Sequence, residues 1–147
     1  MRIDRISKQE GAQVKKLIWK TFLRFDAVDY SEEGVKNFYA YLMQDDLFER
    51  LVFVGAYEED SLIGVIAMSK EHISLFFVDE HYHRKGVGKA LFQSMLRLQK
   101  QMIITVNSSL YAKEVYEHLG FRAINHEIEA GGIRYIPMLY TKNGYLL

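Results

Sequence analysis

The chain has 147 residues, 49% of them apolar and 26% charged, with equal numbers of basic and acidic side chains. This length predicts one domain over residues 1–147, and the zero net charge argues against a general nucleic-acid binder. No apolar run has transmembrane length, and no apolar signal core is present at the start. No cysteine is available for disulfides, thiolate metal sites or a thiol nucleophile. We therefore expect a cytoplasmic protein without membrane partners.

The first half of the chain predicts a strand, two helices and three strands. The strand covers 2–6, and apolar residues at helical spacing follow over 8–25. Ser31 is expected to cap a second helix, whose apolar stripe ends at Met43. The apolar runs 51–57 and 62–68 indicate a hairpin, and 73–78 indicates a third, buried strand.

The second half alternates helices with strands. A helix from Gly86 to about residue 100 precedes a strand at 102–106, and a short helix at 111–119 ends at Gly120. Two more strands are expected around 121–129 and at 133–141. Pro137 cannot donate a ladder hydrogen bond, so the last strand is expected to be an edge, splayed or bulged. The order β-αα-βββ-α-β-α-ββ predicts an α/β chain with mixed strand directions.

The segment HYHRKGVGKALF (81–92) places Gly86 and Gly88 between a strand and a helix. Free N–H groups at a helix start suit a phosphate, and Arg84, Lys85 and Lys89 add positive charge. The Walker pattern is absent, and Leu91 stands where a Rossmann fingerprint needs its third glycine. From these residues alone, a plain strand-to-helix turn is an equal alternative.

The segment resembles the pyrophosphate-binding motif [Q/R]-x-x-G-x-[G/A] of the GNAT superfamily of acetyl-CoA-dependent N-acetyltransferases. Gly86 and Gly88 match, whereas His83 replaces the usual Gln or Arg, a departure that the adjacent Arg84 could offset. A second segment, TVNSSLYAKEVYEHLGF (105–121), resembles the family pattern N-x(4)-A-x(3)-Y-x(3)-GF. The element order of nearly the whole chain also matches the family.

The resemblance implies a GNAT-like α+β fold of three layers, with a mixed, mostly antiparallel sheet of six to seven strands and about four helices. It implies direct transfer of acetyl from the co-substrate acetyl-CoA to an amine, without a metal. The strand before the loop is expected to splay from its neighbour and to contact pantetheine. The residues expected to bind the cofactor are Phe77, Val78, His83, Arg84, Lys85, Gly86, Val87, Gly88, Lys89, Asn107, Ala112 and Tyr116.

By the resemblance, Tyr116 is the general acid that protonates the leaving thiolate. The spacing of Ala112, Val115 and Tyr116 fits one helical face, which also describes a core tyrosine. His72 is the candidate general base, because counting back from the glycine motif leads to it and its ordinary pKa is near 6.5. Glu71 or a water chain could serve instead, and His72 could be a strand-end residue bonded to its neighbours.

Charge is unevenly distributed along the chain. Residues 26–60 hold ten acids and two bases, and residues 81–113 hold six bases and no acid. An acidic side makes a cationic acceptor plausible, bound between the N-terminal helices and the C-terminal strands, although two solvated faces would give the same pattern. The alternatives to an enzyme are a catalytically silent CoA-binding sensor and a nucleotide-binding regulatory domain. The sequence leaves a homodimer open.

Overall fold

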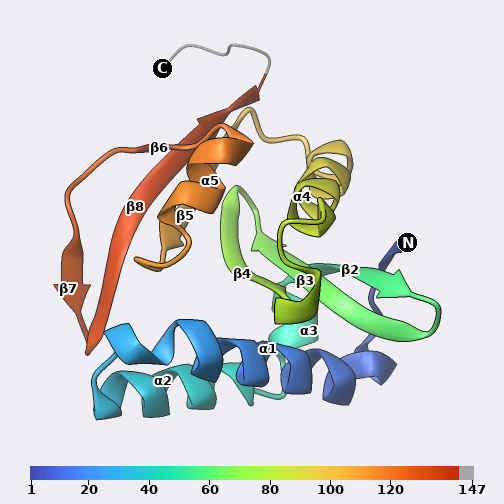
Figure 1. Cartoon of the computed structure of the whole chain (residues 1–147), viewed down its shortest axis with the longest axis horizontal. Coiled ribbons are helices and arrows are strands. Elements are labelled where there is room, and N and C mark those ends of the chain that lie inside the picture. The colour runs from blue at the N-terminus through green and yellow to red at the C-terminus, as the bar shows by residue number, and fades with distance from the viewer. Residues whose placement is uncertain (143–147) are drawn as a thin grey trace.

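A computed structural model describes residues 1–142 and contains one mixed eight-stranded sheet (Figure 1). The strands are β1 (Arg2–Arg5), β2 (Val52–Glu58), β3 (Ser61–Ser69), β4 (His72–Val78), β5 (Ile103–Ser108), β6 (Arg122–Ala123), β7 (Ile128–Ala130) and β8 (Ile133–Thr141). Their order is β1-β2-β3-β4-β5-β8-β6, and β7 also pairs with β8. Every pair is antiparallel except β4–β5. The predicted mixed, mostly antiparallel sheet is confirmed.

Helices cover both faces of this sheet and produce the expected three layers. The helices are α1 (Gly11–Phe25), α2 (Glu32–Leu42), α3 (Leu47–Arg50), α4 (Val87–Leu98) and α5 (Lys113–Leu119). In Figure 1, α1 and α2 lie on one side and α4 and α5 on the other. No helix within residues 1–142 combines the length and the apolar character needed to cross a bilayer.

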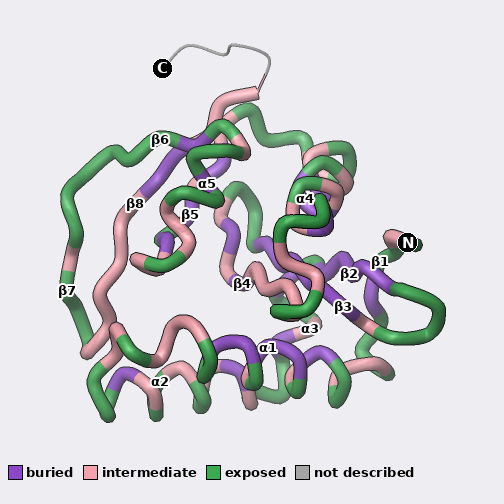
Figure 2. The backbone as a smooth tube through the Cα atoms, in the orientation of Figure 1, coloured by how far each residue is buried: buried purple, intermediate pink, exposed green. Residues whose placement is uncertain are grey.

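The two faces of the sheet bury separate apolar clusters. One cluster joins Val14 and Ile18 of α1 to Leu75 of β4, and the other joins Leu91 of α4 and Tyr116 of α5 to Ile104 of β5. Figure 2 shows this burial concentrated on the central strands and on the inner side of α1. Side chains of a strand alternate between faces, so β4 contributes to both clusters.

Two expected helices are confirmed with changes at their ends. The predicted helix 8–25 begins as a 3₁₀ turn, Lys8–Glu10, before α1 continues to Phe25. Ser31 caps α2 as predicted, because its hydroxyl accepts a hydrogen bond from the Gly34 N–H at 3.0 Å. The four-residue α3 was not predicted, since one turn is too short to show a helical stripe.

Of the three alternatives for the strand with Pro137, an edge, a splay or a bulge, the edge is wrong, because β8 lies between β5 and β6, but the pairing on one side of β8 is interrupted at Pro137. Pro137 O accepts a hydrogen bond from the Ile124 N–H at 3.0 Å, so its backbone nitrogen also faces the β6 side. That nitrogen carries no hydrogen and cannot return the bond. The pairing of β6 ends at Ala123, and the predicted strand 121–129 is divided into β6 and β7.

Candidate functional site

The carboxyl end of β4 separates from β5. Their parallel pairing is limited to His72 with Thr105 and Ile73 with Val106, and β4 continues to Val78 without a partner on that side. Ser74 has no register partner in β3 either, because the β3–β4 register shifts there. The predicted splay between these strands is therefore present, and in Figure 1 the two strands diverge.

Phe76 and Val78 direct backbone groups away from β3 at the unpaired edge of β4, and Val78 O is the one of these that contacts His83. The Asp79 N–H bonds to Ile63 O at 2.8 Å, which sets the alternation of the β3–β4 ladder. By that alternation, Phe77 points its N–H and C=O toward β3, whereas Phe76 and Val78 point theirs toward the open side. The expected contact from Val78 fits this edge. The expected backbone contact from Phe77 is wrong, because the N–H and C=O groups of Phe77 belong to the β3–β4 ladder. Phe76 instead presents its backbone groups to the open side.

The start of α4 lies just beyond this edge and presents unpaired N–H groups. The first helical hydrogen bond runs from the Ala90 N–H to Gly86 O at 3.0 Å, and no side chain caps the helix. The N–H groups before Ala90 therefore have no helical partner. Gly86 has a φ of 81° and Arg84 a φ of 62°, both in the left-handed region. This loop and helix start have the geometry that binds phosphate groups.

His83 turns its ring toward the end of β4. Its Nε2 lies 2.7 Å from Val78 O, its Nδ1 lies 3.5 Å from the Tyr111 hydroxyl, and its ring centre is 5.0 Å from that of Phe25. Phe25 in turn stacks on Tyr111 at 4.7 Å. The exposed side chains of Arg84, Lys85 and Lys89 remain as the cations of the loop, and the contact of His83 with pyrophosphate stays a prediction.

The buried ring of Tyr116 lies on the inner side of α5. It meets Phe76 edge to face at 5.9 Å and Phe121 at 5.3 Å. Burial, and secondly the negative charge of Asp26, raise the pKa of Tyr116 above its ordinary value of 10. Within residues 1–142 its hydroxyl has no hydrogen-bond partner, although every fully enclosed polar side-chain atom there has one. The tyrosine is thus both a core residue and a protonated phenol with a free hydroxyl.

Asn107 and Ala112 lie at the two ends of the β5–α5 loop. Asn107 is exposed in β5 opposite Pro137, and Ala112 precedes the first turn of α5. The Ala112 N–H bonds to the hydroxyl of Ser109 at 3.1 Å, so Ser109 caps this turn and Asn107 does not. The amide of Asn107 remains free to bind a ligand.

His72 lies at the paired end of β4. Its Nδ1 is 2.8 Å from the hydroxyl of Thr105, and burial lowers its pKa below the ordinary 6.5. The imidazole is therefore neutral near pH 7 and able to accept a proton. His81 and His83 are turned toward different partners, His81 to Asp79 and His83 to Val78, and residues 1–142 hold no group of three or more metal-ligating side chains.

Asp26 is a candidate site residue that the sequence did not single out. It follows the last residue of α1, and burial raises its pKa to about 6 against a smaller opposing effect of the Ser109 hydroxyl. Burial of the Tyr30 ring, and secondly the negative charge of Asp26, raises the pKa of Tyr30 to about 12. The only sequence signal was an acid directly after a buried, aromatic-rich helix, which is a weak one.

The β7–β8 hairpin meets the N-terminal helices beside Asp26. The Ser31 N–H bonds to Gly132 O at 2.8 Å, Tyr30 forms a bridge with Ile133, and Arg134 lies 3.9 Å from Asp29. Figure 1 shows the hairpin reaching down to the start of α2. The C-terminal strands and the N-terminal helices are thus in contact here, and an acceptor site between them stays a prediction.

Comparisons with known proteins agree with this geometry. A model of the acetyltransferase (GNAT) domain matches residues 26–142, which include the glycine loop and Tyr116. The N-acetyltransferase YafP of Escherichia coli is 31% identical over 65 residues, but the match covers only 44% of this chain and 42% of YafP. The peptidyl-lysine N-acetyltransferase YjaB of Salmonella typhimurium is 26% identical over 123 residues, 80% of this chain and 81% of YjaB.

A solved structure supports the fold. The PaiA N-acetyltransferase of Thermoplasma acidophilum, crystallised in complex with coenzyme A, matches with a TM-score of 0.78 at 16% identity. The match covers 96% of this chain and 99% of PaiA. At this identity the likeness concerns the arrangement of helices and strands.

Proposed function

Since the chain belongs to the GNAT family of acetyltransferases and is an acetyl-CoA-dependent N-acetyltransferase, we propose that it transfers acetyl directly to a cationic amine in a ternary complex. With no cysteine in the chain, a thiol-bound acyl-enzyme is excluded. Donor and acceptor must then be held together, and the single domain of residues 1–147 offers a region for each on either side of the splayed strands.

The observation that carries this proposal is the free edge of β4 leading to the uncapped start of α4. The N–H and C=O groups of Phe76 suit the amides of pantetheine, and the Val78 N–H suits the thioester oxygen, whereas Val78 O is already in contact with His83 Nε2. The N–H groups from Val87 to Lys89 suit the pyrophosphate, with Arg84 and Lys85 adding charge. Asn107 reaches pantetheine from β5.

Tyr116 supplies the proton for the leaving thiolate in this scheme. Its raised pKa keeps the phenol protonated at neutral pH, so the donor form is always present. Its ring lies against Phe76, whose backbone groups face the open edge. A phenol held next to that edge is placed to protonate the sulfur as the C–S bond breaks.

The acceptor proposal rests on charge. Asp26 and Asp29 lie at the end of α1, and Glu32 and Glu33 occupy the first turn of α2. Such a rim attracts cations, and a lysine side chain, the substrate class named for YjaB, is one example. A cytoplasmic location is part of the same proposal, since acetyl-CoA and such amines meet there.

Thiol release from acetyl-CoA tests the function directly. The chain has no cysteine, so a thiol reagent reports CoA without background from the protein. We expect turnover with at least one of spermidine, kanamycin A and a lysine-containing peptide at pH 7.5, and none with aniline, which is uncharged at that pH. Binding of acetyl-CoA without turnover on any amine would favour the sensor instead, and turnover of aniline alone would exclude a cationic acceptor.

A further inference from the structure

The carboxyl group of Asp26 is half-buried and lacks a cationic partner. Its N–H closes α1 by bonding to Phe22 O at 2.9 Å, so the carboxylate stands at the negative end of a 15-residue helix. Among the described residues no ion pair includes Asp26, whereas the nearby Asp29 lies 3.9 Å from Arg134. An unpaired carboxylate in this position costs stability, which is typical of a group retained for function.

The groups around Asp26 come from both sides of the splayed strands. The Ser109 hydroxyl of the β5–α5 loop acts to lower the pKa of Asp26, and the charge of Asp26 raises the pKa values of Tyr30 and of Tyr116. The carboxyl group therefore lies within electrostatic reach of the proposed general acid. Among residues 1–142, the other charge that acts on Asp26 is that of Asp29, which opposes ionisation.

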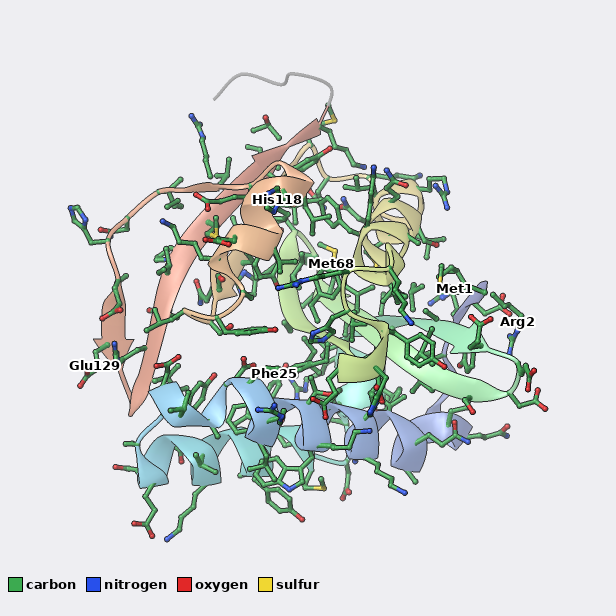
Figure 3. All side chains as sticks on the ribbon, in the orientation of Figure 1. Met1, Arg2, Phe25, Met68, His118 and Glu129 are labelled. Carbon is green, nitrogen blue, oxygen red and sulfur yellow. The ribbon has the colours of Figure 1, made fainter. Side chains whose placement is uncertain are left out.

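The residue before Asp26 connects this carboxyl group to the end of β4. Phe25 packs on His83 and Tyr111, and His83 contacts Val78 O at 2.7 Å. Figure 3 shows Phe25 pointing away from α1 toward the strands. Asp26 thus directly follows a residue that packs at the end of β4, near the proposed position of the thioester, and its charge acts on Tyr30 and Tyr116. Aromatic rings and a carboxylate together suit an ammonium group.

We propose that Asp26 binds the ammonium group of the acceptor and takes its proton. This inference rests on the proposed function. The carboxylate accepts one proton from R–NH₃⁺, and the neutral amine attacks the thioester carbon. The N–C bond forms, the C–S bond breaks, and the thiolate takes the Tyr116 proton. The second proton on nitrogen returns to the phenolate, and Asp26 releases its proton to solvent. The products are the amide, CoA thiol and one proton.

His72 is the competing proton acceptor, and its position is less favourable. It lies four residues before Phe76 and six before Val78, which corresponds to about 13 and 20 Å along an extended strand. Its Nδ1 is also engaged with Thr105. Asp26 instead shares its surroundings with Tyr116, and its pKa near 6 leaves it ionised at pH 7.5 and more basic than an ordinary carboxylate.

The test compares Asp26→Asn with the wild type and with Asp45→Asn, an exposed acid between α2 and α3. With an amine that the wild type acetylates, we expect kcat/KM to fall below about pH 6, since a protonated Asp26 cannot accept a proton. Asp26→Asn should lower kcat about 100-fold and remove this acid limb, with acetyl-CoA affinity unchanged. Asp45→Asn should match the wild type throughout.

Further variants separate a catalytic role from a structural one. Asp26→Glu keeps the carboxyl group and should keep an acid limb at reduced kcat. Asp26→Asn should also raise the Tm of the free protein by a few degrees, because it removes an unpaired carboxylate.

If Asp26→Asn retains kcat and the fall of kcat/KM at low pH, and His72→Ala loses both, then His72 is the base and the inference is overturned. Loss of acetyl-CoA affinity in both Asp26 variants would also overturn it, in favour of a structural role. Absence of thiol release by the wild type with every amine would instead refute the proposed function itself.

Discussion

The phenol of Tyr116 is surrounded by ring edges and yet has no hydrogen-bond partner for its hydroxyl among the described residues. A tyrosine buried only for packing would normally bond its hydroxyl to a neighbour. The free hydroxyl is therefore the feature that separates an acid from a core residue at this position.

We predict that Tyr116→Phe lowers kcat about 100-fold, the usual contribution of a general acid, and leaves the Kd of acetyl-CoA unchanged. Phenylalanine keeps the edge contacts with Phe76 and Phe121, so the Tm should change by less than a few degrees. Single-turnover kinetics and calorimetric titration measure the two quantities. An unchanged kcat would remove Tyr116 from the acid role.

Motif spacing singled out Tyr116 and Asn107 as candidates, because both stand at fixed offsets within one loop and one helix. Asp26 could not be found that way. Its raised pKa comes first from burial, and Ser109 and Tyr116, with which it interacts electrostatically, are more than 80 residues away in the chain. An aspartate after a helix has no special meaning alone. The prediction chose Phe77 over Phe76 for a similar reason. Which of the two residues points its backbone groups to the open edge depends on which neighbour the strand pairs with.

Among the elements, the start of α4 allows a paired experiment on its two glycines. Gly86 has a φ of 81°, so a side chain there costs roughly 1–2 kcal/mol even though the space beside it is open. Gly88 has ordinary helical geometry, and a Cβ there would lie 3.7 Å from the Phe76 ring, a normal contact.

We predict that Gly86→Ala raises the Kd of acetyl-CoA about tenfold or more, because the strained loop redirects the N–H groups that bind pyrophosphate. Gly88→Ala is the matched control and should retain both affinity and stability, as the alanine accepted at this place in the motif suggests. Calorimetric titration of both variants is the measurement. Equal affinity in the two variants would argue that the α4 start is not the pyrophosphate site.

The order of helices and strands was predictable because each long element has its own apolar period. The exceptions lie where tertiary contacts decide how far a strand is paired and where a hairpin ends. The segment 121–129 has the composition of one strand, but Pro137 on the neighbouring strand interrupts its pairing after Ala123. The hairpin tip is fixed by the α2 start, where a Cβ on Gly34 would lie 2.3 Å from Gly132 O. Neither effect can be read from the segment itself.

In the whole molecule, the splay leaves β1–β4 and β5–β8 joined within the sheet by only two register pairs. Other links are the apolar cluster shared by α4 and α5, the Phe25–Tyr111 stack and the bond between Ser31 and Gly132. A CoA molecule between β4 and β5 would add contacts to both parts, so its binding should stabilise the entire fold.

We predict that acetyl-CoA at 100 times its Kd stabilises the protein by about 2.7 kcal/mol and raises its Tm by about 5–10 °C. Hydrogen exchange should slow most at the free amides of Phe76, Val78 and residues 87–89, because these amides become hydrogen-bonded. Adenosine 3′,5′-bisphosphate, which has neither pyrophosphate nor pantetheine, should raise the Tm by much less. An equal effect of the two ligands, or protection confined to α4, would show that the ligand does not join the two parts of the sheet.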